Sequence, residues 1–139
     1  MAPTDRRVQV PPNCDLTLGM VCIDKAEPGR SVWVMKADER FANPVGIIQG
    51  GFLAAFADSS MGAASVTYAA AQERKVFSAN AELKISFLKP VKADGADITC
   101  TAYVISGGSR AAFIEADVVD AGGRLVAKAS STYLLTPRT

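Results

Sequence analysis

The longest stretch of the chain that is almost free of charge covers residues 43–71, where Asp58 is the only charged residue among small and apolar side chains. Apolar residues occur nearly all round a helix drawn through this stretch, which predicts a helix packed against other elements. A membrane span is the other interpretation, but small residues dominate, and a charge at a bilayer centre costs about 2.5–3.5 kcal/mol. We therefore expect a buried helix that begins at Gly50-Gly51, where the first N–H groups are unshielded and attract negative charge.

Patterns with a two-residue period predict strands on both sides of this helix. Apolar and polar residues alternate from Ala79 to Phe87, as in a half-buried strand. Residues 15–24 and 31–37 are rich in β-forming residues and flank a turn at Pro28-Gly29, which predicts a hairpin. Turns at Asp94-Gly95 and at two later glycine pairs complete a predicted four-stranded antiparallel meander, with strands at 79–87, 97–106, 109–120 and 124–135.

This order of elements predicts an α+β fold, with one curved antiparallel sheet of about six strands wrapped round one long central helix. The chain has 139 residues, enough for a single domain with its own core. We take residues 1–139 as that domain, with a loose N-terminal lead-in over residues 1–14.

Composition excludes several classes of protein. The 15 Lys and Arg nearly balance the 14 Asp and Glu, and no basic block is present, so neither nucleic acid nor a membrane is an expected partner. Cys14, Cys22 and Cys100 match no zinc or redox spacing, which predicts no metal site and a reducing compartment, by default the cytoplasm. The N-terminus lacks the apolar core of a secretory signal.

The chain contains no histidine. This excludes Ser-His-Asp and Cys-His catalysis and leaves carboxylates, amides, hydroxyls and backbone dipoles to carry any chemistry. Asp58 is the foremost candidate, although a buried carboxylate that is merely hydrogen-bonded to a neighbouring strand is the alternative interpretation.

Three segments together resemble the acyl-CoA thioesterases of the hotdog-fold superfamily, in the branch with phenylacetyl-CoA and 4-hydroxybenzoyl-CoA thioesterases. They are NPVGIIQGG at 43–51, Ala57-Asp58, and AELKISFLKP at 81–90. The resemblance covers residues 15–135. This chain has Gln49 where the family usually has His, and Asn80 where relatives often have Thr or Ser, and Gln49 cannot titrate near neutral pH.

The resemblance implies hydrolysis of an acyl-CoA thioester. Asp58 would serve as nucleophile or general base, and the N–H of Gly50 would hold the oxyanion. Asn43 and Gln49 would orient the thioester or the water. The alternatives are that Asn43 bonds its own loop and that Gln49 is a packing amide.

The spacing of Gly50 and Asp58 predicts a shared site. Eight helical residues separate them by about 12 Å along the axis, too far to meet on one carbonyl. In a homodimer with antiparallel helices, Gly50 of one subunit faces Asp58 of the other. We expect two equivalent sites per dimer, and pairing of dimers into a tetramer.

Substrate contacts are expected from Gly51, Asn80, Lys89, Ser109 and Arg110, with the two cations meeting coenzyme A phosphates. No cofactor is expected, because the coenzyme A thioester is the substrate. Phe52, Phe56 and Met61 would line the acyl pocket or belong to the core. Two rival functions are a hotdog dehydratase or hydratase, which would need a catalytic histidine, and a non-catalytic acyl-CoA-binding protein.

Overall fold

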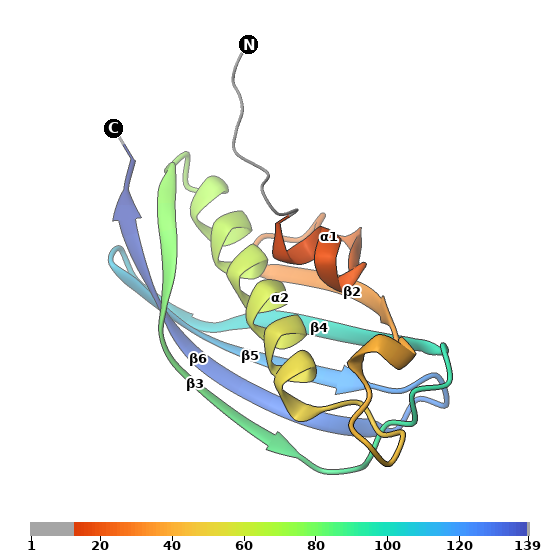
Figure 1. Cartoon of the computed structure of the whole chain (residues 1–139). Coiled ribbons are helices and arrows are strands. Elements are labelled where there is room, and N and C mark those ends of the chain that lie inside the picture. The colour runs from red at the N-terminus through yellow and green to blue at the C-terminus, as the bar shows by residue number, and fades with distance from the viewer. Residues whose placement is uncertain (1–12, 139) are drawn as a thin grey trace.

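The computed structural model describes residues 13–138. In chain order the elements are α1 (Cys14–Leu18), β1 (Val21–Asp24), β2 (Arg30–Lys36), the 3-10 helix η1 (Glu39–Phe41), α2 (Gly50–Ala70), β3 (Val76–Phe87), β4 (Asp97–Gly107), β5 (Ala111–Val119) and β6 (Leu125–Pro137). The strands form one antiparallel sheet in the order β1-β2-β4-β5-β6-β3, which curls round α2 (Figure 1). The predicted α+β architecture and the start of the helix at Gly50 are confirmed.

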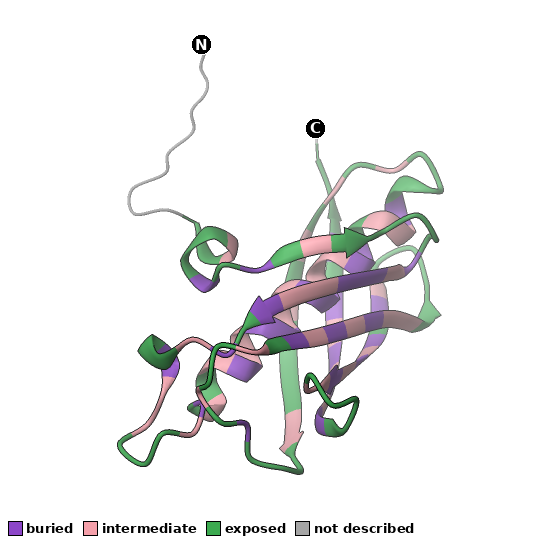
Figure 2. Cartoon of the chain, turned by 90° about the vertical axis from the view of Figure 1, so that its right-hand side faces the viewer, coloured by how far each residue is buried: buried purple, intermediate pink, exposed green. Residues whose placement is uncertain are grey.

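The core lies between α2 and the concave face of the sheet. Phe56 and Met61 of α2 are fully buried there, so both are core residues. In β4 and β5 buried positions alternate with more exposed ones, because successive side chains of a strand point to opposite faces (Figure 2). No helix in the described part of the chain is both long and apolar enough to cross a membrane.

The beginning of the described chain differs from its prediction. Residues 14–18 form α1 rather than the start of a strand, and only Val21–Asp24 pairs with β2. The side chain of Asn13 accepts a hydrogen bond from a first-turn N–H at 3.1 Å, and Gly19 ends the helix at a φ of 70°. Asn13 and Cys14, the last two residues of the predicted lead-in, therefore form the start of α1. The rest of the predicted lead-in, residues 1–12, lies outside the described residues.

One connection of the predicted meander is wrong. β4, β5 and β6 are sequential neighbours, but β3 pairs with β6 and not with β4. The turn at Asp94-Gly95 exists, with Gly95 at a φ of 82°, but it belongs to a crossover over residues 88–96. The N–H of Ile48 donates to the carbonyl of Val91 at 2.8 Å, which ties the crossover to the loop before α2. A turn signal does not say which strands the turn joins.

β3 is an edge strand whose alternation is interrupted by a β-bulge. Its register with β6 shifts between Asn80 and Glu82, so Ala81 has no cross-strand partner. Before the bulge Ala79 lies on the convex face of the sheet, and after it Ile85 lies on the concave face opposite a buried residue of β6. The alternation predicted for residues 79–87 is thus present in the sequence, but the bulge prevents its apolar residues from forming one continuous buried face. Within residues 13–138 no strand pairs with the outer edge of β3.

Candidate active site

Asp58 lies half-buried on α2, at the side that faces β3 and β6. The Nδ2 of Asn80 donates to its Oδ1 at 2.9 Å, and the hydroxyl of Tyr133 donates a short hydrogen bond to the same oxygen. Within residues 13–138 no donor contacts Oδ2 and no cation pairs with the carboxylate. One oxygen is therefore held by neutral donors, and the other is free.

Tyr133 and Ser131 were not among the residues that the sequence indicated. Both are buried on β6, and the Oγ of Ser131 lies 3.3 Å from the Nδ2 of Asn80. Burial, and then the hydrogen bond and negative charge of Asp58, raise the pKa of Tyr133 well above its usual value, so the hydroxyl keeps its proton at neutral pH. The sequence did contain a signal for these two residues. Both are polar side chains at positions of β6 that point into the core, where this strand otherwise buries small and apolar residues.

The N-terminus of α2 leaves one N–H open. Gln49 is the N-cap of the helix, and its Oε1 accepts the N–H of Gly51 at 2.9 Å. No acceptor for the N–H of Gly50 is found in the described part of the chain. A Cβ on Gly50 would lie 2.9 Å from the ring of Phe87, so this position also suits glycine sterically. Gln49 thus stabilises the helix start, and Gly50 retains the donor.

Asn43 closes the loop that precedes α2. Its Oδ1 accepts hydrogen bonds from the N–H groups of Val45 and Ile47, both at 3.1 Å. This is the loop-bonding arrangement that the sequence left open as the alternative for Asn43. Its oxygen is therefore already engaged.

The expected coenzyme A contacts lie at opposite ends of α2. Lys89 is exposed and lines a cavity together with Gly50. Ser109 and Arg110 lie on the exposed β4–β5 hairpin, near the C-terminal part of α2, where Arg74 donates to the carbonyl of Ser109 at 2.6 Å. The 21 residues of α2 make it about 30 Å long, so one chain does not bring these residues together.

Two cavities flank the N-terminus of α2. One has a volume of about 260 Å³ and is lined by Gly50, Phe87 and Lys89 among others, and we call it the Lys89 cavity. The other has a volume of about 520 Å³, lies between α1 and α2, and is called here the α1–α2 pocket. Its described lining residues are Cys14, Thr17, Leu18, Gln49, Gly51, Phe52 and Ala55.

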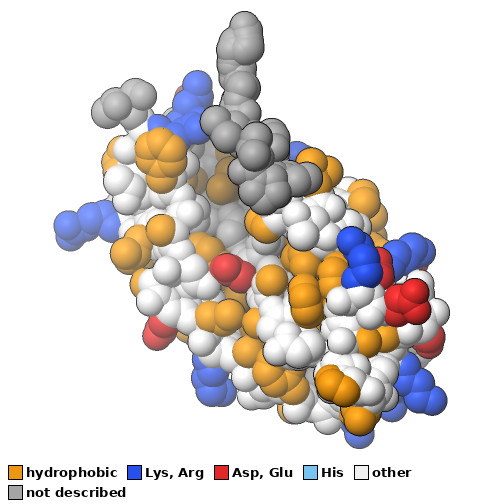
Figure 3. Space-filling model, in the orientation of Figure 1, with side chains coloured by type: hydrophobic (Ala, Val, Ile, Leu, Met, Phe, Trp, Pro, Cys, Tyr) orange, Lys and Arg blue, Asp and Glu red, His pale blue; other side chains and the backbone are white. Residues whose placement is uncertain are grey.

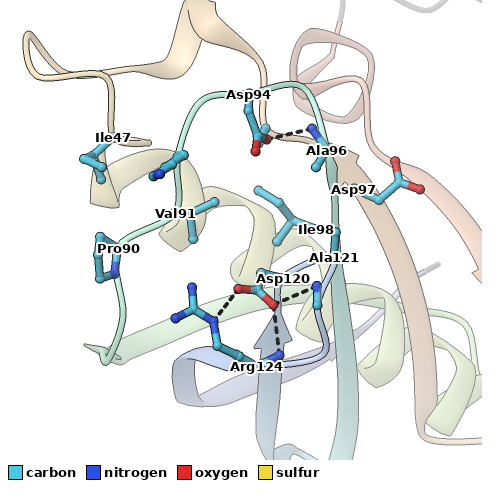
Figure 4. Close-up of a pocket in the computed structure, with 13 residues that line it drawn as sticks. Ile47, Pro90, Val91, Asp94, Ala96, Asp97, Ile98, Asp120, Ala121 and Arg124 are labelled. Carbon is cyan, nitrogen blue, oxygen red and sulfur yellow. Dashed lines mark hydrogen bonds and ion pairs between the residues drawn. The ribbon is translucent and has the colours of Figure 1, made fainter.

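A third cavity, of about 510 Å³, lies under the crossover at the end of the sheet and does not include Asp58 (Figure 4). Its carboxylate Asp120 accepts hydrogen bonds from the backbone and the Nε of Arg124, both at 2.9 Å. These bonds hold the pKa of Asp120 below its usual range. Because this carboxylate is occupied within its own turn, Asp58 is the better candidate for a catalytic carboxylate. Residues 13–138 contain no cluster of potential metal ligands.

A family model described as the thioesterase superfamily matches residues 45–127, which is more than half of the chain. The chain belongs to the thioesterase superfamily. It is accordingly a thioester hydrolase.

Similarity to known proteins extends over most of the hydrolase chain. Acyl-coenzyme A thioesterase 13 of Homo sapiens is 30% identical over 121 residues, which cover 86% of this chain and 83% of the relative. The E. coli PaaI protein from the phenylacetic acid degradation operon superposes with a TM-score of 0.81 at 23% identity, covering 91% of this chain and 86% of that chain. A hypothetical thioesterase from Streptococcus pneumoniae, solved with coenzyme A, has a TM-score of 0.76 at 21% identity, covering 86% and 87%. At these identities the two solved structures show the shared hotdog fold alone.

Proposed function

We propose that this hydrolase cleaves acyl-CoA thioesters, with Asp58 as its nucleophile or general base. The observation that carries the proposal is the asymmetric hydrogen bonding of Asp58. Its Oδ1 is held by Asn80 and Tyr133, and its Oδ2 has no donor within the described residues. A half-buried carboxylate without a cation, held in one orientation, is suited to reaction.

Two reaction courses fit this carboxylate. In the first, Oδ2 attacks the thioester carbonyl, the C–S bond breaks to release the thiolate of coenzyme A, and water then hydrolyses the acyl anhydride. In the second, Oδ2 takes a proton from a water molecule that attacks the carbonyl directly, and the C–S bond then breaks to release the thiolate of coenzyme A, which can take up that proton. In both, the carbonyl oxygen becomes an oxyanion, for which the free N–H of Gly50 at the positive end of α2 is the donor.

The proposed site is shared between two copies of the chain. Gly50 and Asp58 lie on the same helix, about 12 Å apart along its axis. The face of α2 turned away from the sheet carries small residues such as Gly51 and Ala55, and no described element fully covers it. Figure 3 looks onto this face, where uncharged and hydrophobic side chains dominate the centre and most charges lie toward the rim. An antiparallel partner helix on this face would bring Gly50 of one copy to Asp58 of the other.

The outer edge of β3 supports the same dimer. An unpaired edge strand with apolar side chains is a template for pairing with another chain. Phe77 is 63% exposed and Phe87 is 51% exposed, at the two ends of this strand. We propose a homodimer with two equivalent sites, which could pair further into a tetramer.

In this assembly Lys89 and the hairpin residues Ser109 and Arg110 meet the coenzyme A phosphates from different subunits. The coenzyme A bound to the pneumococcal neighbour supports this class of substrate. Asn80 acts through Asp58, and Asn43 and Gln49 act by shaping the loop and the helix start. No cofactor is required by either reaction course. All three cysteines are free, which supports a reducing compartment such as the cytoplasm.

A panel of acyl-CoA thioesters, with thiol release followed by a thiol-reactive dye, tests the activity. We expect hydrolysis by the wild type and its near loss in Asp58→Asn. Tight binding of acyl-CoA without turnover in both proteins would instead indicate an acyl-CoA-binding protein.

Mixing two inactive variants tests the shared site. Gly50→Pro removes the N–H at a position where helices tolerate proline, and Gln49 before it is already extended. Gly50→Ala is the control, because it adds the same Cβ against Phe87 and keeps the N–H. After subunit exchange, an equal mixture of Gly50→Pro and Asp58→Asn should regain about one quarter of wild-type activity, since half of the dimers then contain one intact site. No recovery, with exchange verified, would assign the site to a single chain.

A further inference from the structure

The two cavities at the N-terminus of α2 differ in charge. The Lys89 cavity has a cation at its wall. The larger α1–α2 pocket has no charged side chain among its described lining residues, which are apolar except for Thr17 and the amide of Gln49. Its volume of about 520 Å³ lies within the range of about 300–1,000 Å³ that is usual for ligand pockets.

Contacts on both sides define the shape of the α1–α2 pocket. Leu18 of α1 is buried in the core, and the Sγ of Cys14 lies 3.6 Å from the Oγ of Ser59 on α2. On the opposite wall, the ring of Phe52 stacks on Phe41 with centroids 4.5 Å apart. Both walls are therefore fixed by packing within the described chain.

The proposed reaction centre lies between these two cavities. Gly50, which offers the oxyanion donor, lines the Lys89 cavity, and the next residue, Gly51, lines the α1–α2 pocket. A thioester carbonyl bound at the N–H of Gly50 thus has one cavity on each side. Its two substituents, the acyl group and the sulfur-linked arm of coenzyme A, need two such spaces.

We propose, as an extension that rests on the proposed function, that the α1–α2 pocket receives the acyl group and selects apolar, uncharged acyl chains. The coenzyme A arm extends on the side of Lys89, whose positive charge is complementary to the negative charge of the phosphates. An acyl group with a terminal carboxylate is rejected, because none of the described lining residues offers that carboxylate a cation after its water is removed.

A pair of substrates of equal length tests the chemistry of the pocket. Hexanoyl-CoA and adipoyl-CoA have the same number of acyl carbons, but adipoyl-CoA ends in a carboxylate. We expect kcat/KM for hexanoyl-CoA to be higher by about tenfold or more. Hydrolysis of both at equal rates would overturn the assignment of the pocket and leave the thioesterase function intact. Hydrolysis of no acyl-CoA would overturn the proposed function itself.

Filling the pocket from either wall tests its location. Cys14→Phe on α1 and Ala55→Leu on α2 should each lower the ratio of kcat/KM for octanoyl-CoA to that for acetyl-CoA by about tenfold or more. Ala70→Leu is the matched control, since it makes the same change at an exposed position at the far end of α2. Because Ala55→Leu could also disturb the dimer, Cys14→Phe decides the test. An unchanged ratio in Cys14→Phe would overturn the proposal.

Discussion

Asp58 and Asp117 are both half-buried carboxylates beside a tyrosine, but their electrostatic surroundings are opposite. Asp58, on the concave side of the sheet, is held by the neutral donors Asn80 and Tyr133. Asp117, on the convex side, receives the Nζ of Lys128 at 2.6 Å. Asp117 is paired with a cation, whereas Asp58 has no cation partner within residues 13–138.

The pairing of Asp117 follows from strand register. Asp117 and Lys128 are directly opposite each other on β5 and β6, and opposite charges at such positions attract. Tyr103 joins them, since its hydroxyl accepts from Lys128 at 2.7 Å and lies 3.4 Å from Asp117. In the proposed mechanism, a carboxylate paired with a cation supports the fold, whereas one held by neutral donors is available for reaction.

The largest expected difference between the two carboxylates is in catalysis. Asp58→Asn should lower kcat by about 10²–10⁴-fold, because the amide can neither attack nor take a proton. Asp117→Asn makes the same chemical change outside the proposed site and should leave kcat nearly unchanged. Thiol release on one acyl-CoA substrate measures both, and circular dichroism checks the fold. Equal losses in the two variants would contradict the distinct roles of the two carboxylates.

The second largest difference is expected between Tyr133, beside Asp58, and Tyr103, beside Asp117. Tyr133→Phe removes a hydrogen bond to a charged group, worth about 1.5–3 kcal/mol, so kcat should fall by about tenfold to a hundredfold. Tyr103→Phe is the control and should leave kcat nearly unchanged. An unchanged kcat in Tyr133→Phe would contradict the role of this hydroxyl in holding Asp58.

A smaller effect is expected on stability. Lys128→Met removes the cation from Asp117, but the Lys128 side chain is 37% exposed, so the free energy of unfolding should fall by less than about 1 kcal/mol. Urea unfolding measures this change, and kcat serves as the control that should stay constant. A loss of several kcal/mol would show that this network supports the sheet more than a surface ion pair does.

The smallest effect is the pH dependence of that stabilisation. Burial lowers the pKa of Lys128, but hydrogen bonds from Lys128 to Asp117 and Tyr103 outweigh it, so the pKa lies above its usual value. A raised pKa means that the stabilisation is fully present at neutral pH and is lost only above about pH 10.4, the unfolded value, as the folded lysine loses its proton. The difference in unfolding free energy between wild type and Lys128→Met should therefore be constant from pH 7 to pH 9 and shrink at higher pH. A difference that already shrinks below pH 9 would contradict the raised pKa.

Much of the fold was predictable from local patterns. The long uncharged run with Gly50-Gly51 at its start predicted α2, and Asp58 stood out as its only charge. The strand periods and turns predicted the six strands within a few residues, except that residues 14–18 are helical. These features depend on neighbours along the chain, whose propensities and periods the sequence displays directly.

The remaining features depend on contacts between distant residues. Tyr133 reaches Asp58 across 75 positions of the chain, and it can do so only because β6 runs beneath α2. β3 bypasses β4 and pairs with β6, which brings Asn80 to the same carboxylate. Local sequence determined which elements form and where the acid lies, and only the competition among strand pairings in three dimensions decided which donors hold that acid.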